Sequence, residues 1–339
     1  MIRIVKFGLA ACVLLLIVGS IYQIVQSRSD NLAFPAPGKL YDVAGLMVHL
    51  DCRGDGSPTL VMEAGLTQGS KTWSKIRDAL SHKTQFCAYD RPGLDWSEPL
   101  GKTASAEEIS QRLHQLLQVA KIDGPKILVG MSAGGVYVRE YYQHFPENIV
   151  GMAFIDSSHE QQGNRLPVIE SDNSLEMAFS FCKAFQWTGL IRAMGFLDPF
   201  INIPGISESD KPLRQAKLNQ SHSCASIRFE SLSFSEEVRD VEEPKSLGDL
   251  PLLVLSQGKQ PEANEANGMT FEQALRMGEV WNELQIELTN LSTQGQRFVA
   301  KNSGHVIQRE QPELIIEKLS EFIDQVRSNK LVSNTPDAS

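Results

Sequence analysis

The chain has 339 residues and carries 41 acidic against 32 basic side chains, which gives a formal net charge of −9. No cluster of Lys and Arg stands out, so we do not expect a nucleic-acid partner. The sequence also has no glycine-rich phosphate-binding motif and no Cys or His spacing typical of zinc, so we expect no cofactor and no metal.

The segment from Phe7 to Val25 is almost wholly apolar and is long enough to cross a bilayer as a helix. Arg3 and Lys6 precede it, and positive charge favours the cytoplasmic side of a membrane. We therefore predict an anchor within residues 1–25 that makes the membrane a partner and leaves the rest of the protein on the non-cytoplasmic side of the cell membrane. The alternative is a signal peptide cleaved after residues 18–20, which would release a secreted or periplasmic protein.

A main domain is expected to begin after a short connection. Residues 26–38 are polar and contain proline, which predicts a linker. Residues 39–156 predict six strands and three helices, and Ser105 with Glu108 forms a capping box at the start of one of these helices. This pattern of alternating strands and helices predicts an α/β domain.

The most informative motif is Gly130-Met131-Ser132-Ala133-Gly134. It lies between residues 126–130, an apolar run that predicts a buried strand, and residues 136–142, which predict a helix. A G-x-S-x-G pattern in this context is typical of a nucleophile elbow. Such a turn leaves little space for side chains at the two glycines, and it presents the Ser132 hydroxyl to a substrate carbonyl. We expect Ser132 to be a catalytic nucleophile.

Attack on a carbonyl also requires hydrogen-bond donors for the oxyanion that forms. One expected donor is the backbone N–H of Ala133, which follows the nucleophile. The second is expected from the loop after the predicted strand at residues 58–63. Gly65 permits a sharp turn in that loop, which makes the N–H of Leu66 the predicted second donor.

Two carboxylates are candidates for the acid of a catalytic triad. Asp156 ends the apolar run 150–155, and Glu262 lies in the loop after the predicted strand 250–256. The later loop is the common location of the acid, but it contains no Asp. We favour Asp156 and keep Glu262 as the alternative, because both loops lie at the carboxyl ends of neighbouring strands and either could reach the same imidazole.

His305 is the predicted base. It lies in a loop between the strand-like run 297–300 and an amphipathic helix that begins at Pro312. The chain order Ser, acid, His is usual in proteins whose serine lies on a nucleophile elbow. His159 is the rival base, because it lies close to the candidate acid Asp156.

Residues 157–247 predict a cap inserted into the main domain, which resumes over residues 248–327. The polar residues 328–339 predict a disordered tail. The cap is rich in Met and aromatic residues, which favours an apolar acyl or alcohol pocket over the serine. Four cysteines allow two disulfides in an oxidising compartment or buried thiols otherwise; they are Cys52, Cys87, Cys182 and Cys224.

Several ordered motifs resemble those of a bacterial branch of the α/β-hydrolase superfamily over about residues 40–327. These motifs are Glu63–Leu66, Cys87–Gly93, Val129–Gly135, Phe154–His159 and Ser303–His305. The resemblance implies an eight-stranded, mostly parallel sheet with helices on both faces and an inserted helical cap. It also implies a triad of Ser132, His305 and a carboxylate.

The favoured interpretation is a serine hydrolase, and within that class a carboxylesterase that acts on a small or medium apolar ester. The same triad serves an aminopeptidase, an amidase or a C–C hydrolase, so these remain alternatives. A non-catalytic binding protein that is tethered to a membrane and has the same fold is the alternative from another class.

Overall fold

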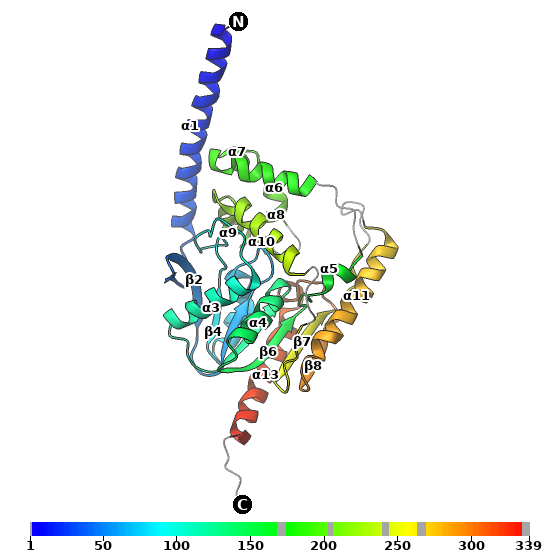
Figure 1. Cartoon of the computed structure of the whole chain (residues 1–339). Coiled ribbons are helices and arrows are strands. Elements are labelled where there is room, and N and C mark those ends of the chain that lie inside the picture. The colour runs from blue at the N-terminus through cyan, green and yellow to red at the C-terminus, as the bar shows by residue number, and fades with distance from the viewer. Residues whose placement is uncertain (1, 168–173, 203–205, 239–243, 263–268, 334–339) are drawn as a thin grey trace, which may run out of the picture.

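The centre of the protein is an eight-stranded sheet with the strand order β1-β2-β4-β3-β5-β6-β7-β8 (Figure 1). The computed structural model describes residues 2–167, 174–202, 206–238, 244–262 and 269–333. β2 pairs antiparallel with β1 and β4, and the other neighbours are parallel. The strands are β1 (Lys39–Val43), β2 (Leu46–Arg53), β3 (Thr59–Glu63), β4 (Phe86–Tyr89), β5 (Lys126–Met131), β6 (Ile149–Ile155), β7 (Leu252–Gln257) and β8 (Gly295–Ala300). The predicted fold class is thus confirmed.

Helices cover both faces of the sheet. The helices that lie between β6 and β7 in the chain form a separate layer. The main-domain helices are the 3₁₀ helix η1 (Ser70–Trp73), α2 (Ser74–Leu80), α3 (Ala106–Val119), α4 (Ala133–His144), α11 (Phe271–Thr289), α12 (Ile307–Glu310) and α13 (Pro312–Ser333). The inserted helices are α5 (Gln162–Arg165), α6 (Ser174–Phe185), the 3₁₀ helix η2 (Gln186–Thr188), α7 (Leu190–Ala193), α8 (Asp198–Ile201), α9 (Lys211–Leu218) and α10 (Ser223–Glu237). A long helix, α1 (Ile2–Ala33), precedes the main domain.

The parallel strands are apolar because both of their faces are covered. On β5, Ile127 and Val129 belong to a cluster that includes Leu319 of α13. Leu128 points to the opposite face, as the two-residue period of a strand requires, and lies in a second cluster with Leu117 of α3. The sheet is therefore the middle layer of three, and its carboxyl edge is left for loops.

The capping box predicted at the start of α3 is confirmed. Ser105 Oγ accepts a hydrogen bond from the Glu108 N–H at 3.1 Å, and the Glu108 carboxylate accepts one from the Ser105 N–H, also at 3.1 Å. Two N–H groups that the helix itself leaves without a partner are thereby satisfied.

The inserted helices lie over the carboxyl edge of the sheet. Phe234 and Val238, at the end of α10, pack against Val136 and Tyr137 of α4, the helix that follows the predicted nucleophile. A disulfide between Cys182 of α6 and Cys224 of α10 lies in a second, small core of this layer. A further disulfide joins Cys52 to Cys87, which are directly opposite each other on β2 and β4.

The segment predicted as a linker is partly helical, because α1 continues through residues 26–33 and ends at Ala33. The inserted layer accounts for this extension. Arg192 of α7 donates a hydrogen bond to the Asp30 carboxylate at 2.8 Å, and Gln23 Nε2 donates to the Asn219 carbonyl at 2.7 Å. Tertiary contacts thus keep a polar sequence helical.

The boundary predicted for the tail also differs from the structure, because α13 extends to Ser333. Residues 328–333 are helical, and residues 334–339 lie outside the described part of the chain. The apolar stripe of α13 packs on the sheet through Ile315, Leu319 and Phe322. Residues 328–333 continue this packed helix.

Candidate active site

Ser132 lies at a sharp turn between β5 and α4, with φ 53° and ψ −126°. Few residues other than glycine adopt a positive φ, and such strain is found mainly at functional sites. A Cβ atom on Gly130 would lie 2.6 Å from the Gly134 carbonyl oxygen, and one on Gly134 would lie 2.5 Å from the Glu63 carbonyl oxygen. The two glycines of the motif are therefore required by backbone packing on either side of Ser132.

The structure brings Ser132 together with His305 and Asp156, although the three residues come from different loops. His305 Nε2 lies 2.9 Å from Ser132 Oγ, and His305 Nδ1 lies 2.6 Å from Asp156 Oδ2. Both contacts are within hydrogen-bonding distance. The imidazole therefore connects the hydroxyl to a carboxylate, which is the arrangement by which a base is oriented and a hydroxyl activated.

Asp156 is held rigidly at the end of β6. It is fully buried and has φ 44°. Its Oδ1 accepts hydrogen bonds from the Gln257 N–H at 2.8 Å and from Trp281 Nε1 at 3.0 Å, while Oδ2 faces His305. A buried carboxylate requires such partners, and these contacts direct one oxygen at the imidazole.

The alternative acid and the rival base lie elsewhere. Glu262 is exposed, and within the described residues it forms no ion pair with His305. His159 is buried with its Nε2 3.6 Å from the Glu287 carboxylate, and its Nδ1 accepts a hydrogen bond from the Gln161 N–H. Burial lowers the pKa of His159, partly opposed by the nearby Glu160 carboxylate. Neither residue contacts Ser132 or His305 through a hydrogen bond in the part of the chain that is described.

The two predicted oxyanion donors border the serine. Ala133 is the first residue of α4, so its N–H has no acceptor within the helix. A Cβ on Gly65 would lie 3.2 Å from Ser132 Cβ and 2.7 Å from Met131 Sδ, which places the loop that carries Leu66 directly against Ser132. The absence of a side chain at Gly65 allows that approach.

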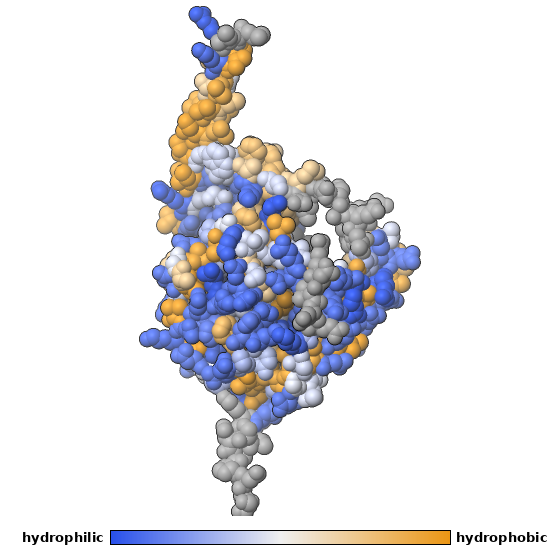
Figure 2. All heavy atoms as spheres, viewed as in Figure 1, coloured by the Kyte–Doolittle hydropathy of each residue, from blue (hydrophilic) through white to orange (hydrophobic). Residues whose placement is uncertain are grey.

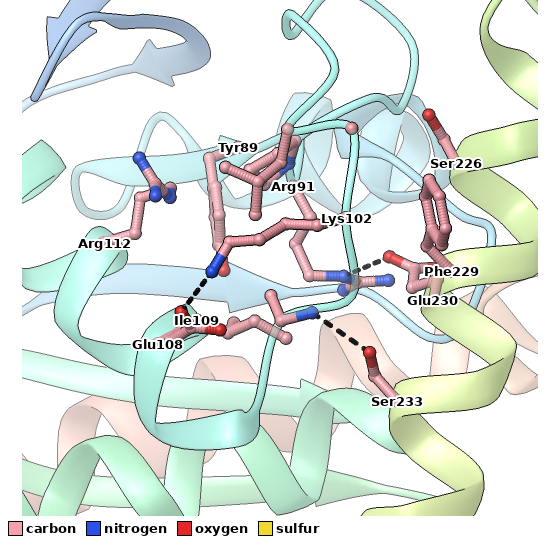
Figure 3. Close-up of a pocket in the computed structure, with 14 residues that line it drawn as sticks. Tyr89, Arg91, Lys102, Glu108, Ile109, Arg112, Ser226, Phe229, Glu230 and Ser233 are labelled. Carbon is pink, nitrogen blue, oxygen red and sulfur yellow. Dashed lines mark hydrogen bonds and ion pairs between the residues drawn. The ribbon is translucent and has the colours of Figure 1, made fainter.

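Arg91, which Figure 3 shows paired with Glu230, also binds the backbone of this loop. Its guanidinium donates hydrogen bonds to the carbonyl oxygens of Ala64 and Gly65, both at 2.7 Å. It also forms ion pairs with Glu63 at 2.5 Å and with Glu230 of α10 at 2.7 Å. Burial alone would lower the pKa of Arg91, but these two carboxylates raise it above its ordinary value. Arg91 therefore connects an inserted helix to the predicted oxyanion loop.

The Glu230 carboxylate also binds the predicted oxyanion loop directly. Its Oε2 accepts a hydrogen bond from the Thr67 N–H at 2.5 Å, one residue after Leu66. Figure 3 shows Glu230 and Ser233 pointing from α10 toward the segment that contains Arg91. Ser233 Oγ accepts a hydrogen bond from the Ala104 N–H at 3.1 Å. The position of α10 is thus coupled to the main domain at several points.

A cavity of about 440 Å³ opens beside the serine and the histidine. Its lining combines apolar side chains with a few polar ones. The lining residues are Ser132, Ser158, Gln162, Leu166, Phe234, Gln257, Lys259, Gln260, Pro261, Met277, Trp281, Gly304 and His305. This is the size and character of a site for a small organic molecule.

Sequence reasoning missed two residues that shape the site. Trp281 donates to Asp156 and its ring lies edge-on to His305, with centroids 5.5 Å apart. It comes from the middle of α11, where an aromatic residue has no local signature of such a role. Glu230 is one of several acidic residues in the predicted cap, and only its contact with Arg91 distinguishes it from the others.

A family model described as the alpha/beta hydrolase fold matches residues 58–181. An uncharacterized protein of Schizosaccharomyces pombe is 25% identical over 338 residues, and the alignment covers 87% of this chain and 58% of that protein. The uncharacterized protein YqjL of Bacillus subtilis is 24% identical over 278 residues, covering 82% of this chain and 88% of that protein. The chain thus spans little more than half the length of the first relative and most of the second.

Among solved structures, a putative lipase from Acinetobacter baumannii is similar with a TM-score of 0.62 and 17% identity, covering 91% of this chain and 97% of that one. Identity this low concerns the fold alone. Together with the sheet order and the family match, it establishes that the chain has the α/β-hydrolase fold and supports its place in the α/β-hydrolase superfamily.

Proposed function

We propose that the protein is a serine hydrolase, and specifically a carboxylesterase. The observation that carries the proposal is the chain of contacts from Ser132 Oγ through His305 to the buried Asp156 carboxylate. A hydroxyl, an imidazole and a carboxylate in this order of contact support the roles of nucleophile, base and orienting acid in acyl transfer. The family match and the similarity to a putative lipase agree with hydrolysis in general.

In this mechanism Ser132 Oγ attacks the ester carbonyl while His305 Nε2 takes the hydroxyl proton. The N–H groups of Leu66 and Ala133 stabilise the resulting oxyanion. His305 then protonates the departing alcohol, which leaves an acyl group on Ser132. Water, deprotonated by His305, hydrolyses the acyl-enzyme. Asp156 holds the imidazole in the tautomer that has a free Nε2 and stabilises the imidazolium.

The cavity beside Ser132 supports an ester with an apolar portion of small or medium size. Leu166, Phe234 and Met277 contribute apolar walls, and Trp281 adds a ring next to the imidazole. Three glutamines and a lysine provide polar contacts at the same cavity. No acidic side chain is among the described residues that line it, and the cap residues Glu170 and Asp172 lie outside the described part of the chain.

We also propose that α1 anchors the protein in the membrane, with the hydrolase domain on the non-cytoplasmic side. Within the described residues α1 is long and apolar enough to span a bilayer, a property that anchors share with signal sequences. The contacts of Gln23 and Asp30 with the inserted helices support retention over cleavage. The two disulfides agree with an oxidising compartment.

A fluorophosphonate probe tests the catalytic part of the proposal. We expect the full-length protein in detergent to be labelled covalently, and the Ser132→Ala variant to remain unlabelled. Ser209→Ala, which removes an exposed hydroxyl on the inserted layer, is the matched control and should label like the wild type. Turnover of acyl esters by Ser132→Ala should fall by on the order of 10⁶-fold. Labelling that persists in Ser132→Ala would contradict the proposal.

A further inference from the structure

The inserted layer has an exposed apolar face next to α1. Met177, Phe181 and Phe185 follow one another at four-residue spacing on α6, so they share one side of that helix. Leu190 and Met194 continue the surface along α7, and all five side chains are more than a third exposed. Together with Trp187 of η2, we call these residues the apolar cap face.

The opposite side of the same helices is fully packed. Cys182, on α6 between two members of the apolar cap face, is buried in its disulfide with Cys224. Ile191 of α7 and Leu197 are buried in the same small core. The apolar cap face is therefore not part of the core of the inserted layer, because these helices already bury a separate inner face. It is a second apolar side of the inserted layer, and no described residue covers it.

The apolar cap face is continuous with the apolar surface of α1. Figure 1 shows α1 passing alongside α7 before it projects from the body of the protein, and Figure 2 shows apolar side chains on α1 and on the neighbouring top of the cap. The contact is close: a Cβ on Gly19 would lie 2.2 Å from the Thr188 carbonyl oxygen, and one on Gly189 would lie 2.7 Å from the Gly19 carbonyl oxygen. The helix and the cap are thus joined backbone to backbone.

The position of this contact along α1 sets its depth. The apolar run ends at Val25, six residues beyond Gly19. At a rise of 1.5 Å per residue, the contact with η2 lies about 9 Å inside the apolar run. Since nearly all of the run is needed to cross the hydrocarbon core, this part of the cap lies in the outer part of that core, within about 9 Å of its boundary. Interfacial helices bury their apolar faces to about 5–10 Å, a matching depth.

Two polar groups in this region have hydrogen-bond partners within the protein. Gln23 interrupts the apolar run, but its side chain is buried against the cap and donates to the Asn219 carbonyl. The indole Nε1 of Trp187 donates to the Ala184 carbonyl at 2.8 Å, so its ring can enter an apolar medium without leaving an N–H unpaired. Tryptophan is also the residue type that favours the membrane–water boundary.

We propose that the apolar cap face inserts into the boundary region of a phospholipid bilayer, so that the hydrolase domain is held against the membrane at two places, α1 and the cap. The inference rests on the proposed anchoring by α1 and is independent of catalysis. A phospholipid bilayer is the occupant that fits, because the face continues the surface of the helix that spans it and lies at the matching depth.

Tryptophan fluorescence provides a direct test, because α1 contains no Trp. Trp187 is 52% exposed on the apolar cap face, whereas Trp73 is fully buried and the other two tryptophans are partly buried. The full-length protein is incorporated into phosphatidylcholine vesicles whose acyl chains carry bromine, a quencher of indole emission that acts over short range. Unbrominated vesicles are the reference. We expect brominated lipid to quench the wild type and most of that quenching to disappear in Trp187→Phe.

Trp96→Phe is the matched control. Trp96 lies in the main domain, where its Nε1 donates to the Phe34 carbonyl, so its removal should leave the quenching in place. Ser132→Ala should be quenched like the wild type, which separates this proposal from the proposed chemistry. A Phe181→Asp and Leu190→Asp double variant should remain in the vesicles through α1 but lose quenching.

Three results would overturn the proposal. Protein that floats with the vesicles but shows equal quenching in wild type and Trp187→Phe has its anchor in the membrane and its cap outside it. Concentration-dependent dimers in the membrane, with Trp187 shielded from bromine, would assign the apolar cap face to a second copy of the chain. Protein that fails to float would refute both the anchoring and the contact of the cap with lipid.

Discussion

At the scale of single residues, the two candidate acids differ in their surroundings. Asp156 and Glu262 both follow strands whose carboxyl ends meet at the same edge of the sheet. Only Asp156 is buried and directed, because Gln257 and Trp281 bind one of its oxygens and leave the other for His305. Glu262 is exposed, and ordering it against the imidazole would cost side-chain entropy.

The acid can be tested with a matched pair of variants. Asp156→Asn should lower kcat on an acyl ester by on the order of 10⁴-fold, because an amide at this position favours the wrong imidazole tautomer. Glu262→Gln should leave kcat close to the wild-type value. Steady-state kinetics at neutral pH, with circular dichroism to verify folding, measures both. The reverse ranking would assign the acid to Glu262.

Asp95 is a residue whose charge should affect stability. Burial, and secondarily the nearby Asp90 carboxylate, raises its pKa from 3.8 to about 7. The folded protein therefore retains a proton that the unfolded chain loses near pH 4, so the stability contributed by protonated Asp95 is present below about pH 4 and is lost as the pH rises to about 7.

Asp95→Asn removes this titration while keeping a similar shape. We expect the unfolding free energy of the variant, relative to the wild type, to rise between pH 4 and pH 7 and to level off above that range. Urea unfolding at several pH values measures the difference. Curves that stay parallel across this range would show that Asp95 does not titrate in it.

At the scale of elements, Arg91 is the point where three segments meet. It joins Glu63 at the end of β3, the carbonyl oxygens of the following loop, and Glu230 on α10. The placement of an inserted helix thereby bears on the loop that carries the predicted oxyanion donor. Removing one partner of a buried ion pair leaves the others uncompensated.

Arg91→Ala should therefore destabilise the protein by about 3–5 kcal/mol, since Glu63 would remain buried without its cation. Arg112→Ala, in the same region but with a single hydrogen bond to the Val43 carbonyl, is the control and should cost much less. Chemical unfolding measured under identical conditions compares them. A loss of less than about 1 kcal/mol in Arg91→Ala would mean that water replaces the guanidinium.

At the scale of the whole molecule, α1 is part of the folded structure and not only a tether. Its Gly19 lies against η2, and its Asp30 pairs with Arg192 of α7. Gly8 on the same helix has no atom within 4 Å of the position where a Cβ would lie. The two glycines therefore differ in packing while sharing the same helix.

This difference predicts different effects for two alanine substitutions. Gly19→Ala places a methyl group against the Thr188 carbonyl and should destabilise the protein by about 1–3 kcal/mol. Gly8→Ala should be neutral or slightly stabilising, because alanine favours a helix over glycine. Thermal unfolding of both full-length variants in the same detergent gives the comparison, and equal behaviour would show that α1 does not pack on the cap.

The sequence by itself determined the sheet, the order of its motifs, and Ser132 with His305 as candidates, because these depend on local patterns. Apolar runs specify buried strands, and the tight elbow requires glycines at fixed spacing. Only the tertiary structure placed Asp156, and not Glu262, against His305, brought Trp281 and Glu230 next to the candidate site, and extended α1 to Ala33. Those features depend on which groups meet across loops far apart in the chain, and short sequence patterns carry no record of such distances.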